Sequence, residues 1–404
     1  MKRLLHSLAC LLCGLMLPLA GAAEAAQTPE AALGESLSPI FERYQTVGAC
    51  VAAIENGRVR YVYCYGSRDP GGEPVTERTL FRVGSISKMA TAMGVMRLVE
   101  DGALTLDGDL GDALGFTLRH PDYPHTLVTL RQLMSHTAGL RDSGYYTMAL
   151  RGAGKTLSGI FTGDSANWLF YSGSEPGMKC EYSNFGGGML GSLIEAASGQ
   201  TVDEYMNEQI FVPLGVTAAY QSALLPQDAE VANMYSGRSL AARVRDGAPA
   251  YTAPDADRHF TLTAGKLTIS APDLAKLVIA LCDGGVCGDA RVLRESSALA
   301  MTTNQSYVGS VACETTYGLC TIFVKDAFLP GRTLVGHGGK ANGMLCAAYF
   351  DPADRTGVVM LTNGCKNNSY VDGVAALSRA VVRAVYDGLF AEGAHQVEDP
   401  FLVE

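Results

Sequence analysis

The stretch Phe81-Arg82-Val83-Gly84-Ser85-Ile86-Ser87-Lys88 places a serine and a lysine in the order Ser-x-x-Lys. Residues 89–100 are expected to continue as a helix, because apolar residues recur there at spacings of three and four. Side chains three apart on a helix lie about 5–6 Å apart at Cβ, so Ser85 and Lys88 would share a face. A lysine among apolar groups loses its proton more easily, and its neutral amine can accept the serine proton. Ser-x-x-Lys is common by chance, so this interpretation needs further residues.

Sheet and helix patterns on both sides of this stretch predict the fold. A helix over 28–46 precedes two strands joined at Asn56-Gly57, a dipeptide typical of hairpin turns. After residue 260, strand-like runs alternate with turn residues, and a helix follows over 371–389. We expect an α/β (α+β) fold with an antiparallel sheet from both chain ends, flanked by helices, and an inserted all-helical lobe. The expected boundaries are 27–103 and 259–404 for the sheet domain and 104–258 for the mainly helical insertion.

The first 26 residues have the pattern of a secretory signal peptide. Lys2 and Arg3 precede an apolar run over 4–19, and small residues follow as a cleavage site. The run is shorter than the ~20 residues of a membrane-spanning helix. We therefore expect cleavage of residues 1–26 and an exported protein, periplasmic or secreted, without a transmembrane span. The net charge of −10 argues against nucleic acid as a partner. We expect a monomer with a small-molecule or peptide substrate.

The chain has 11 cysteines, and an exported protein with many cysteines is expected to form disulfides. Three pairs stand at spacings that a disulfide could bridge: Cys50 with Cys64, Cys282 with Cys287, and Cys313 with Cys320. The cysteines that then remain in the mature chain are Cys180, Cys346 and Cys365. At least one thiol is therefore expected to stay unpaired. The histidines do not cluster, so we expect neither a metal ion nor a cofactor.

Two further stretches complete the pattern that begins at Ser85. Tyr182-Ser183-Asn184 precedes a glycine-rich segment, and His337-Gly338-Gly339 lies between two expected strands. Together these motifs resemble those of the serine β-lactamase-related family, in the branch of class C β-lactamases, D-alanyl-D-alanine carboxypeptidases and family VIII carboxylesterases. The flanking residues 129–140 and 213–215 also resemble this family, so the resemblance covers most of the mature chain. It implies the penicillin-recognising fold and a serine hydrolase.

The resemblance implies a role for each motif residue. Ser85 is expected to be the nucleophile that forms an acyl-enzyme, and Lys88 and Tyr182 are expected to move its proton. The sequence leaves open which of the two accepts that proton. Asn184 could hold Lys88 or a substrate amide, because its side chain both donates and accepts hydrogen bonds. The oxyanion would lie between the backbone N–H groups of Ser85 and Lys340. The other expected substrate-binding residues are His337, Gly338, Gly339, Lys340 and Asn342.

The third motif departs from the Lys-Thr pair with which many relatives hold a substrate carboxylate. At His337-Gly338 the cation is at best a protonated histidine, and the hydroxyl is missing. Esters, D-amino-acid peptides and amides are therefore expected to compete with β-lactams as substrates. Structural alternatives remain for His337, and for Asn184 as a helix cap, while His136 is expected to be structural. The competing function is a catalytically weak penicillin-binding relative that binds peptidoglycan fragments or a protein partner.

Overall fold

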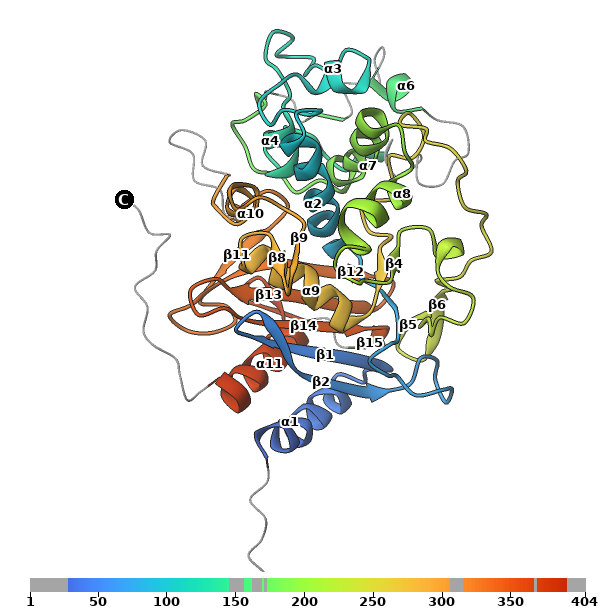
Figure 1. Cartoon of the computed structure of the whole chain (residues 1–404), viewed down its shortest axis with the longest axis vertical. Helices are drawn as coiled ribbons and strands as arrows, with labels where there is room; N and C mark the ends of the chain where they lie inside the picture. The colour runs from blue at the N-terminus through green and yellow to red at the C-terminus, as the bar shows by residue number, and fades with distance from the viewer. Residues whose placement is uncertain are drawn as a thin grey trace, which may run out of the picture.

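The computed structural model describes residues 28–144, 156–161, 169–170, 173–305, 315–366 and 369–390. Its centre is a seven-stranded antiparallel sheet in the order β10-β11-β12-β13-β14-β1-β2. The strands are β1 Gly48–Glu55, β2 Arg58–Gly66, β10 Thr316–Tyr317, β11 Ile322–Lys325, β12 Thr333–Ala341, β13 Met344–Asp351 and β14 Thr356–Thr362. Strand β1 lies beside β14 (Figure 1). The two strands pair so that Ala49 lies opposite Thr362. The expected antiparallel sheet from both chain ends is confirmed.

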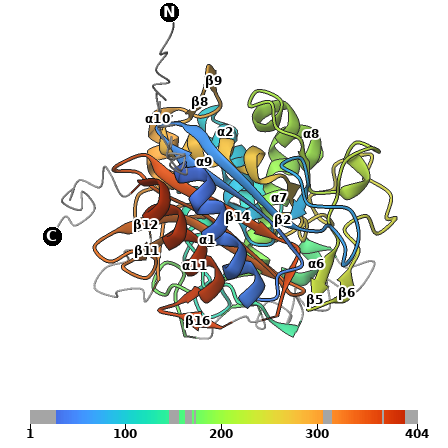
Figure 2. The ribbon, with the colours of Figure 1, turned by 90° about the horizontal axis from the view of Figure 1, so that it is seen from below.

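Helices cover both faces of this sheet. One face carries α1 (Pro29–Arg43) and α11 (Ala376–Val385), which lie side by side across the strands in Figure 2. Their apolar side chains form one core with alternate residues of the strands, among them Leu334 and Tyr349. The other face carries α9 (Ala271–Cys282) and belongs to a second, larger core. Residues that alternate along one strand therefore enter different cores, as the period of a strand requires.

Helix α2 (Ile86–Glu100) lies between the sheet and the helical part of the molecule. It contacts α7 (Asn184–Ser198), α8 (Val202–Met206) and β12. Its side chains from Ile86 to Met96 are buried on every side, rather than along the single apolar stripe expected. A helix that is enclosed all round must bury its polar residues as well, and this places Lys88 in the interior.

Residues 104–258 supply most of the remaining helices. The described elements of this segment are α3 Leu110–Leu114, α4 Leu130–Met134, α6 Leu157–Phe161, α7, α8, the π-helix Asn207–Phe211, the 3₁₀-helix Ser222–Leu224, β4 Ala218–Ala219, β5 Met234–Ser236 and β6 Ser239–Ala242. The short strands are a difference from an all-helical insertion. Strand β4 pairs with β7 (Thr268–Ile269), and β5 pairs with β15 (Gly364–Cys365), so the segment joins strands that come later in the chain. The domain boundaries themselves stay a prediction.

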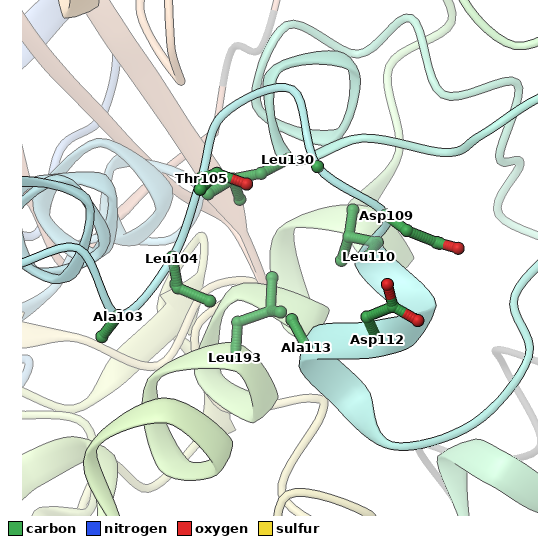
Figure 3. Close-up of a pocket in the computed structure, with 10 residues that line it drawn as sticks. Ala103, Leu104, Thr105, Asp109, Leu110, Asp112, Ala113, Leu130 and Leu193 are labelled. Atoms are coloured by element: carbon green, nitrogen blue, oxygen red, sulfur yellow. The ribbon is translucent and has the colours of Figure 1, made fainter.

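The other short elements complete the described chain. They are β3 Phe81–Arg82, β8 Val286–Cys287, β9 Ala290–Arg291, α10 Glu295–Met301, β16 Tyr370–Val371, β17 Val374–Ala375 and the π-helix Tyr386–Phe390. Figure 3 shows a cavity of about 320 Å³ between α3, α7 and the loop that leads into α3, with Leu104, Leu110 and Leu193 in its lining. Within the described ranges, no helix is long and apolar enough to span a membrane.

The cysteines differ in part from the expected pairing. Cys50 lies opposite Cys64 in the β1–β2 register, as expected, but their sulfurs are 3.3 Å apart and no disulfide is formed. Cys282 and Cys287 are free thiols too. The expected bond between Cys313 and Cys320 is wrong, because Cys320 is a buried free thiol. Cys313 lies outside the described residues. By contrast, Cys180 is disulfide-bonded.

Candidate active site

Ser85 and Lys88 meet at the first turn of α2. Gly84, with φ of 56°, bends the chain so that Ser85 takes the cap position of the helix. The Lys88 Nζ atom lies 3.1 Å from Ser85 Oγ, 2.9 Å from Asn184 Oδ1 and 2.6 Å from the carbonyl oxygen of Ala264. These three acceptors come from α2, from the start of α7 and from the segment that returns to the sheet. The amine is therefore fixed from three sides.

The stem of Lys88 is enclosed as tightly as its amine. The side chain is fully buried, and a Cβ atom added to Gly187 of α7 would lie 2.3 Å from Lys88 Cε. Only a glycine leaves room for the lysine stem at this point of the helix. Burial lowers the pKa of Lys88 from its usual value to about 8, although the carboxylate of Asp142 opposes this shift. A substantial fraction of the amine is consequently neutral near pH 8.

Tyr182 lies beside this amine, with its ring centroid 5.1 Å from Lys88 Nζ. Burial raises the pKa of Tyr182 well above its usual value, and the nearby Ser85 hydroxyl opposes this rise. The buried Tyr182 hydroxyl nevertheless makes no hydrogen bond of acceptable geometry to the described residues. Ser85 and Tyr182 are therefore neighbours without a formed hydrogen bond. Tyr182 is a neutral phenol in this resting arrangement.

Two buried histidines flank the phenol. The ring centroids of His136 and Tyr182 are 4.5 Å apart, and those of His337 and Tyr182 are 6.1 Å apart. His136 Nδ1 accepts the N–H of Ser183 at 3.3 Å, so its neutral ring carries the proton on Nε2. His337 Nδ1 lies 2.6 Å from the carbonyl oxygen of Gly338, which places the His337 proton on Nδ1. The two neutral rings are thus opposite tautomers on either side of Tyr182.

His337 does not supply the cation that the sequence left possible at this position. Burial and the nearby Lys88 amine lower the pKa of His337 to about 3. Burial and the same amine also lower the pKa of His136 well below its usual value. Both rings are therefore neutral at physiological pH. A substrate carboxylate would find no positive charge on either histidine.

Asn184 is oriented by Asp142, a residue that the sequence motifs did not reveal. The Asn184 side chain donates to Asp142 Oδ2 at 2.7 Å and accepts from Lys88 through its Oδ1 atom. The same carboxylate accepts the backbone N–H groups of Asn184 and Phe185 at the N-terminus of α7. An anion is favourable at that end of a helix. Asp142 therefore holds the Asn184 side chain and the start of α7 in place, and we expect it to position the site. In the sequence, its only signal is that it follows the stretch ending at Gly139-Leu140.

Replacement of Asp142 by asparagine is expected to lower kcat/KM about tenfold, because an amide cannot accept all of these N–H groups. The decrease should appear in kcat and leave KM nearly unchanged, since Asp142 orients Asn184, which contacts Lys88. Steady-state kinetics on a chromogenic ester would measure it. Asp122→Asn is the control, because Asp122 accepts the N–H of Gly173 instead. A rise in KM alone would contradict the positioning role.

The exposed edge of β12 forms the opposite wall. Strand β11 pairs with β12 only from Ile322 opposite Gly336 to Lys325 opposite Thr333. Beyond Gly336, no described strand pairs with that edge of β12. A Cβ atom on Gly339 would lie 2.0 Å from the carbonyl oxygen of Val83, and one on Gly84 would lie 3.1 Å from the backbone nitrogen of Lys340. The Lys340 N–H thus lies beside the Gly84–Ser85 turn, where the oxyanion is expected.

One cavity of about 510 Å³ joins the two walls. Its lining includes most of the expected site residues, namely Ser85, Tyr182, Asn184, His337, Gly338, Gly339 and Lys340. Lys88 lies behind Ser85. Asn342 is not brought into the cavity, because it occupies the turn between β12 and β13 with φ of 47°. Among the described residues, no group of three or more metal-ligating side chains comes together.

Comparison with known proteins agrees with this geometry. The family model described as Beta-lactamase matches residues 27–383. The chain belongs to the β-lactamase family. Penicillin-binding protein 4 of Amycolatopsis lactamdurans is 28% identical over 343 residues, which are 82% of this chain and 84% of that protein. Esterase EstB of Burkholderia gladioli is 29% identical over 236 residues, which are 54% of this chain and 58% of that protein.

Two solved structures share the fold of this chain. The D-amino acid amidase from Ochrobactrum anthropi SV3 has a TM-score of 0.67 at 22% identity, covering 89% of this chain and 98% of that chain. The octameric penicillin-binding protein homologue from Pyrococcus abyssi has a TM-score of 0.67 at 24% identity, with coverages of 90% and 78%. At these identities the likeness shows the fold alone. The expected family, fold and serine hydrolase class are confirmed, while the expected monomer stays a prediction.

Proposed function

We propose that this member of the β-lactamase family is an exported serine hydrolase that cleaves carboxylic esters or amides through an acyl-enzyme at Ser85. The observation that carries the proposal is the distance of 3.1 Å between Lys88 Nζ and Ser85 Oγ. A general base must lie within hydrogen-bond reach of the proton that it removes, with a pKa near the working pH. With a pKa of about 8, Lys88 meets both requirements. The signal pattern of residues 1–26, which lie outside the described residues, supports export.

The proposed reaction assigns the proton to Lys88 first. The neutral Lys88 amine takes the proton of Ser85 as Oγ attacks the carbonyl carbon of the substrate. The backbone N–H groups of Ser85 and Lys340 stabilise the negative oxygen of the tetrahedral intermediate. Tyr182 is a neutral phenol, so it gives its proton to the leaving group and regains one from the Lys88 ammonium. Attack of water on the acyl-enzyme, assisted by the same groups in reverse, then releases the acid and restores Ser85.

Among the substrate classes, we rank carboxylic esters before β-lactams and D-alanyl peptides. The last two carry a carboxylate, for which relatives use a Lys-Thr pair. Here His337 is neutral and Gly338 has no hydroxyl. Lys340 is the only charged side chain among the described residues that line the cavity. A carboxylate would thus depend on Lys340, whose Nζ atom lies 4.9 Å from the ring centroid of Tyr370.

Intact-mass analysis after treatment with a fluorophosphonate or with penicillin tests the proposal. We expect one adduct on the wild-type protein and none on Ser85→Ala. An equal adduct on Ser85→Ala, or none on the wild type, would overturn the assignment of Ser85. Turnover of a nitrophenyl ester, a chromogenic cephalosporin and a D-Ala-D-Ala peptide then separates the substrate classes. A stable adduct without turnover of any of them would instead support the penicillin-binding alternative.

A further inference from the structure

The alternation of side chains along β12 separates two faces of the sheet at the active site. Val335 and His337 point toward α2, since Val335 belongs to the larger core with the helices of that face. Leu334 belongs to the opposite core, on the face of α1 and α11. By the period of the strand, Gly338 and Lys340 share the face of Leu334. A Cβ atom on Gly338 would indeed lie 3.3 Å from the Tyr349 hydroxyl, and Tyr349 belongs to the α11 core.

The active-site cavity reaches around the strand edge onto this second face. Ser85 and Tyr182 line one end of the cavity, and Phe328 and Tyr349 line the other. The passage exists for two reasons. The pairing of β11 with β12 stops at Gly336, and the next residue on the α11 face is Gly338, which has no side chain to close the gap. The cavity is therefore continuous from the nucleophile to the α11 face.

Most of the side chains that line this far end are apolar, although Ser378 of α11 also lines the cavity. Its walls are formed by Ile322, Val324, Phe328, Tyr349 and Val374. None of the described residues that line the cavity is a carboxylate, and the one charged side chain, Lys340, lies on β12. An apolar group gains free energy when it leaves water for such a surface, whereas an ammonium group would lose its hydration without a partner. The lining consequently favours a hydrocarbon chain and disfavours a cationic one.

We propose that this far end, the α11-side chamber, binds an uncharged hydrocarbon chain of the substrate whose carbonyl group is attacked by Ser85. The chain passes over the edge of β12 at Gly338 and lies between Ile322, Phe328 and Val374. The proposal rests on the esterase or amidase function proposed for Ser85. It adds the substrate class, which is medium-chain aliphatic esters or amides without a positive charge on the chain. The tests below separate a chain on the acyl side from one on the leaving group.

Two ester series measure the chamber directly. Nitrophenyl acetate, butyrate and hexanoate vary the acyl chain, and methyl, propyl and hexyl acetate vary the alcohol. A fully buried methylene contributes about fourfold. We expect kcat/KM to rise by about tenfold or more with length in one of the two series, and that series identifies the side. Nitrophenyl 6-aminohexanoate should react at least tenfold more slowly than the hexanoate. Equal kcat/KM values along both series would contradict the proposal that the chamber binds a substrate chain.

Variants that fill the chamber provide the second test. Ile322→Trp and Val324→Trp place a large ring in it, and either is expected to reduce the chain-length preference at least tenfold. Val371→Trp is the matched control, because Val371 is 39% exposed and does not line the cavity. Fluorophosphonate labelling at Ser85 shows that each variant is folded. An unchanged chain-length preference in variants that are still labelled would contradict only the proposal that the chamber binds the chain. No labelling of the wild type would contradict the proposed function itself.

Discussion

Lys88→Met is expected to lower kcat/KM for an activated ester by about 10³-fold, within the range that a general base contributes. The methionine side chain fills the space of the lysine stem but cannot accept the Ser85 proton. The effect should appear equally in the rate of fluorophosphonate labelling, because labelling requires the same attack by Ser85 Oγ. Lys325→Met on β11 is the control, since Lys325 is exposed and should leave both rates unchanged. A loss in labelling smaller than tenfold would contradict the role of Lys88.

The pH dependence of the wild type tests the same residue. Only the neutral amine can act as base, so kcat/KM should rise about tenfold per pH unit below the Lys88 pKa and level off above it. The pKa of about 8 places the midpoint near pH 8. Titration of His337 could not produce a midpoint near pH 8, because the pKa of His337 is about 3. A flat profile between pH 6 and pH 10 would show that the amine does not accept the proton.

Gly187→Ala is expected to abolish most of the activity, with a loss of at least 10²-fold. The new methyl group would occupy the space of the Lys88 stem, where a Cβ atom comes within 2.3 Å of Cε and 2.7 Å of Cδ. The Lys88 amine would then leave the positions from which it reaches Ser85 and Asn184. The helix itself should not suffer, because alanine is about 1 kcal/mol more favourable than glycine in a helix interior. Activity and circular dichroism together measure the two effects.

Gly186→Ala is the matched control for this change. A Cβ atom there would lie 3.2 Å from Leu133 Cδ1, the end of a side chain that can shift, and it would not touch Lys88. We expect this variant to keep at least a third of the wild-type kcat/KM. If both variants lost activity equally, the cause would be the helix rather than the lysine stem. If Gly187→Ala stayed active, the Lys88 side chain would be able to reach Ser85 in another conformation.

The elements that follow local rules could be predicted from the sequence. Strands β1 and β2 alternate around Asn56-Gly57, whose positive φ angles of 51° and 74° suit a two-residue hairpin turn. Helix α2 was expected from its apolar spacing. Ser85, Tyr182 and His337 were expected to share a site because three short motifs stood in a familiar order, and one cavity does contain all three.

The remaining features depend on packing between distant segments, which a single sequence does not display. The neutral state of His337 follows from complete burial beside Lys88, and no local pattern indicates it. The hydrogen bonds of Asp142 to Asn184 depend on how the loop after His136 packs against the N-terminus of α7. Likewise, the role of Gly187 depends on the position of Lys88 on another helix. Each of these effects is a contact between residues far apart in the chain.

The three acceptors of the Lys88 amine come from segments with different neighbours. Asn184 begins α7, whose later residue Glu195 bonds to His259, and Ala264 follows His259 on the way back to the sheet. The contacts of the proposed general base thus exist only while α2, α7 and residues 259–264 are packed together. A small displacement of α7 from its neighbours would abolish activity even if the seven-stranded sheet stayed intact. A loss of turnover should therefore report a displacement of α7 that a spectroscopic signal from the sheet would not detect.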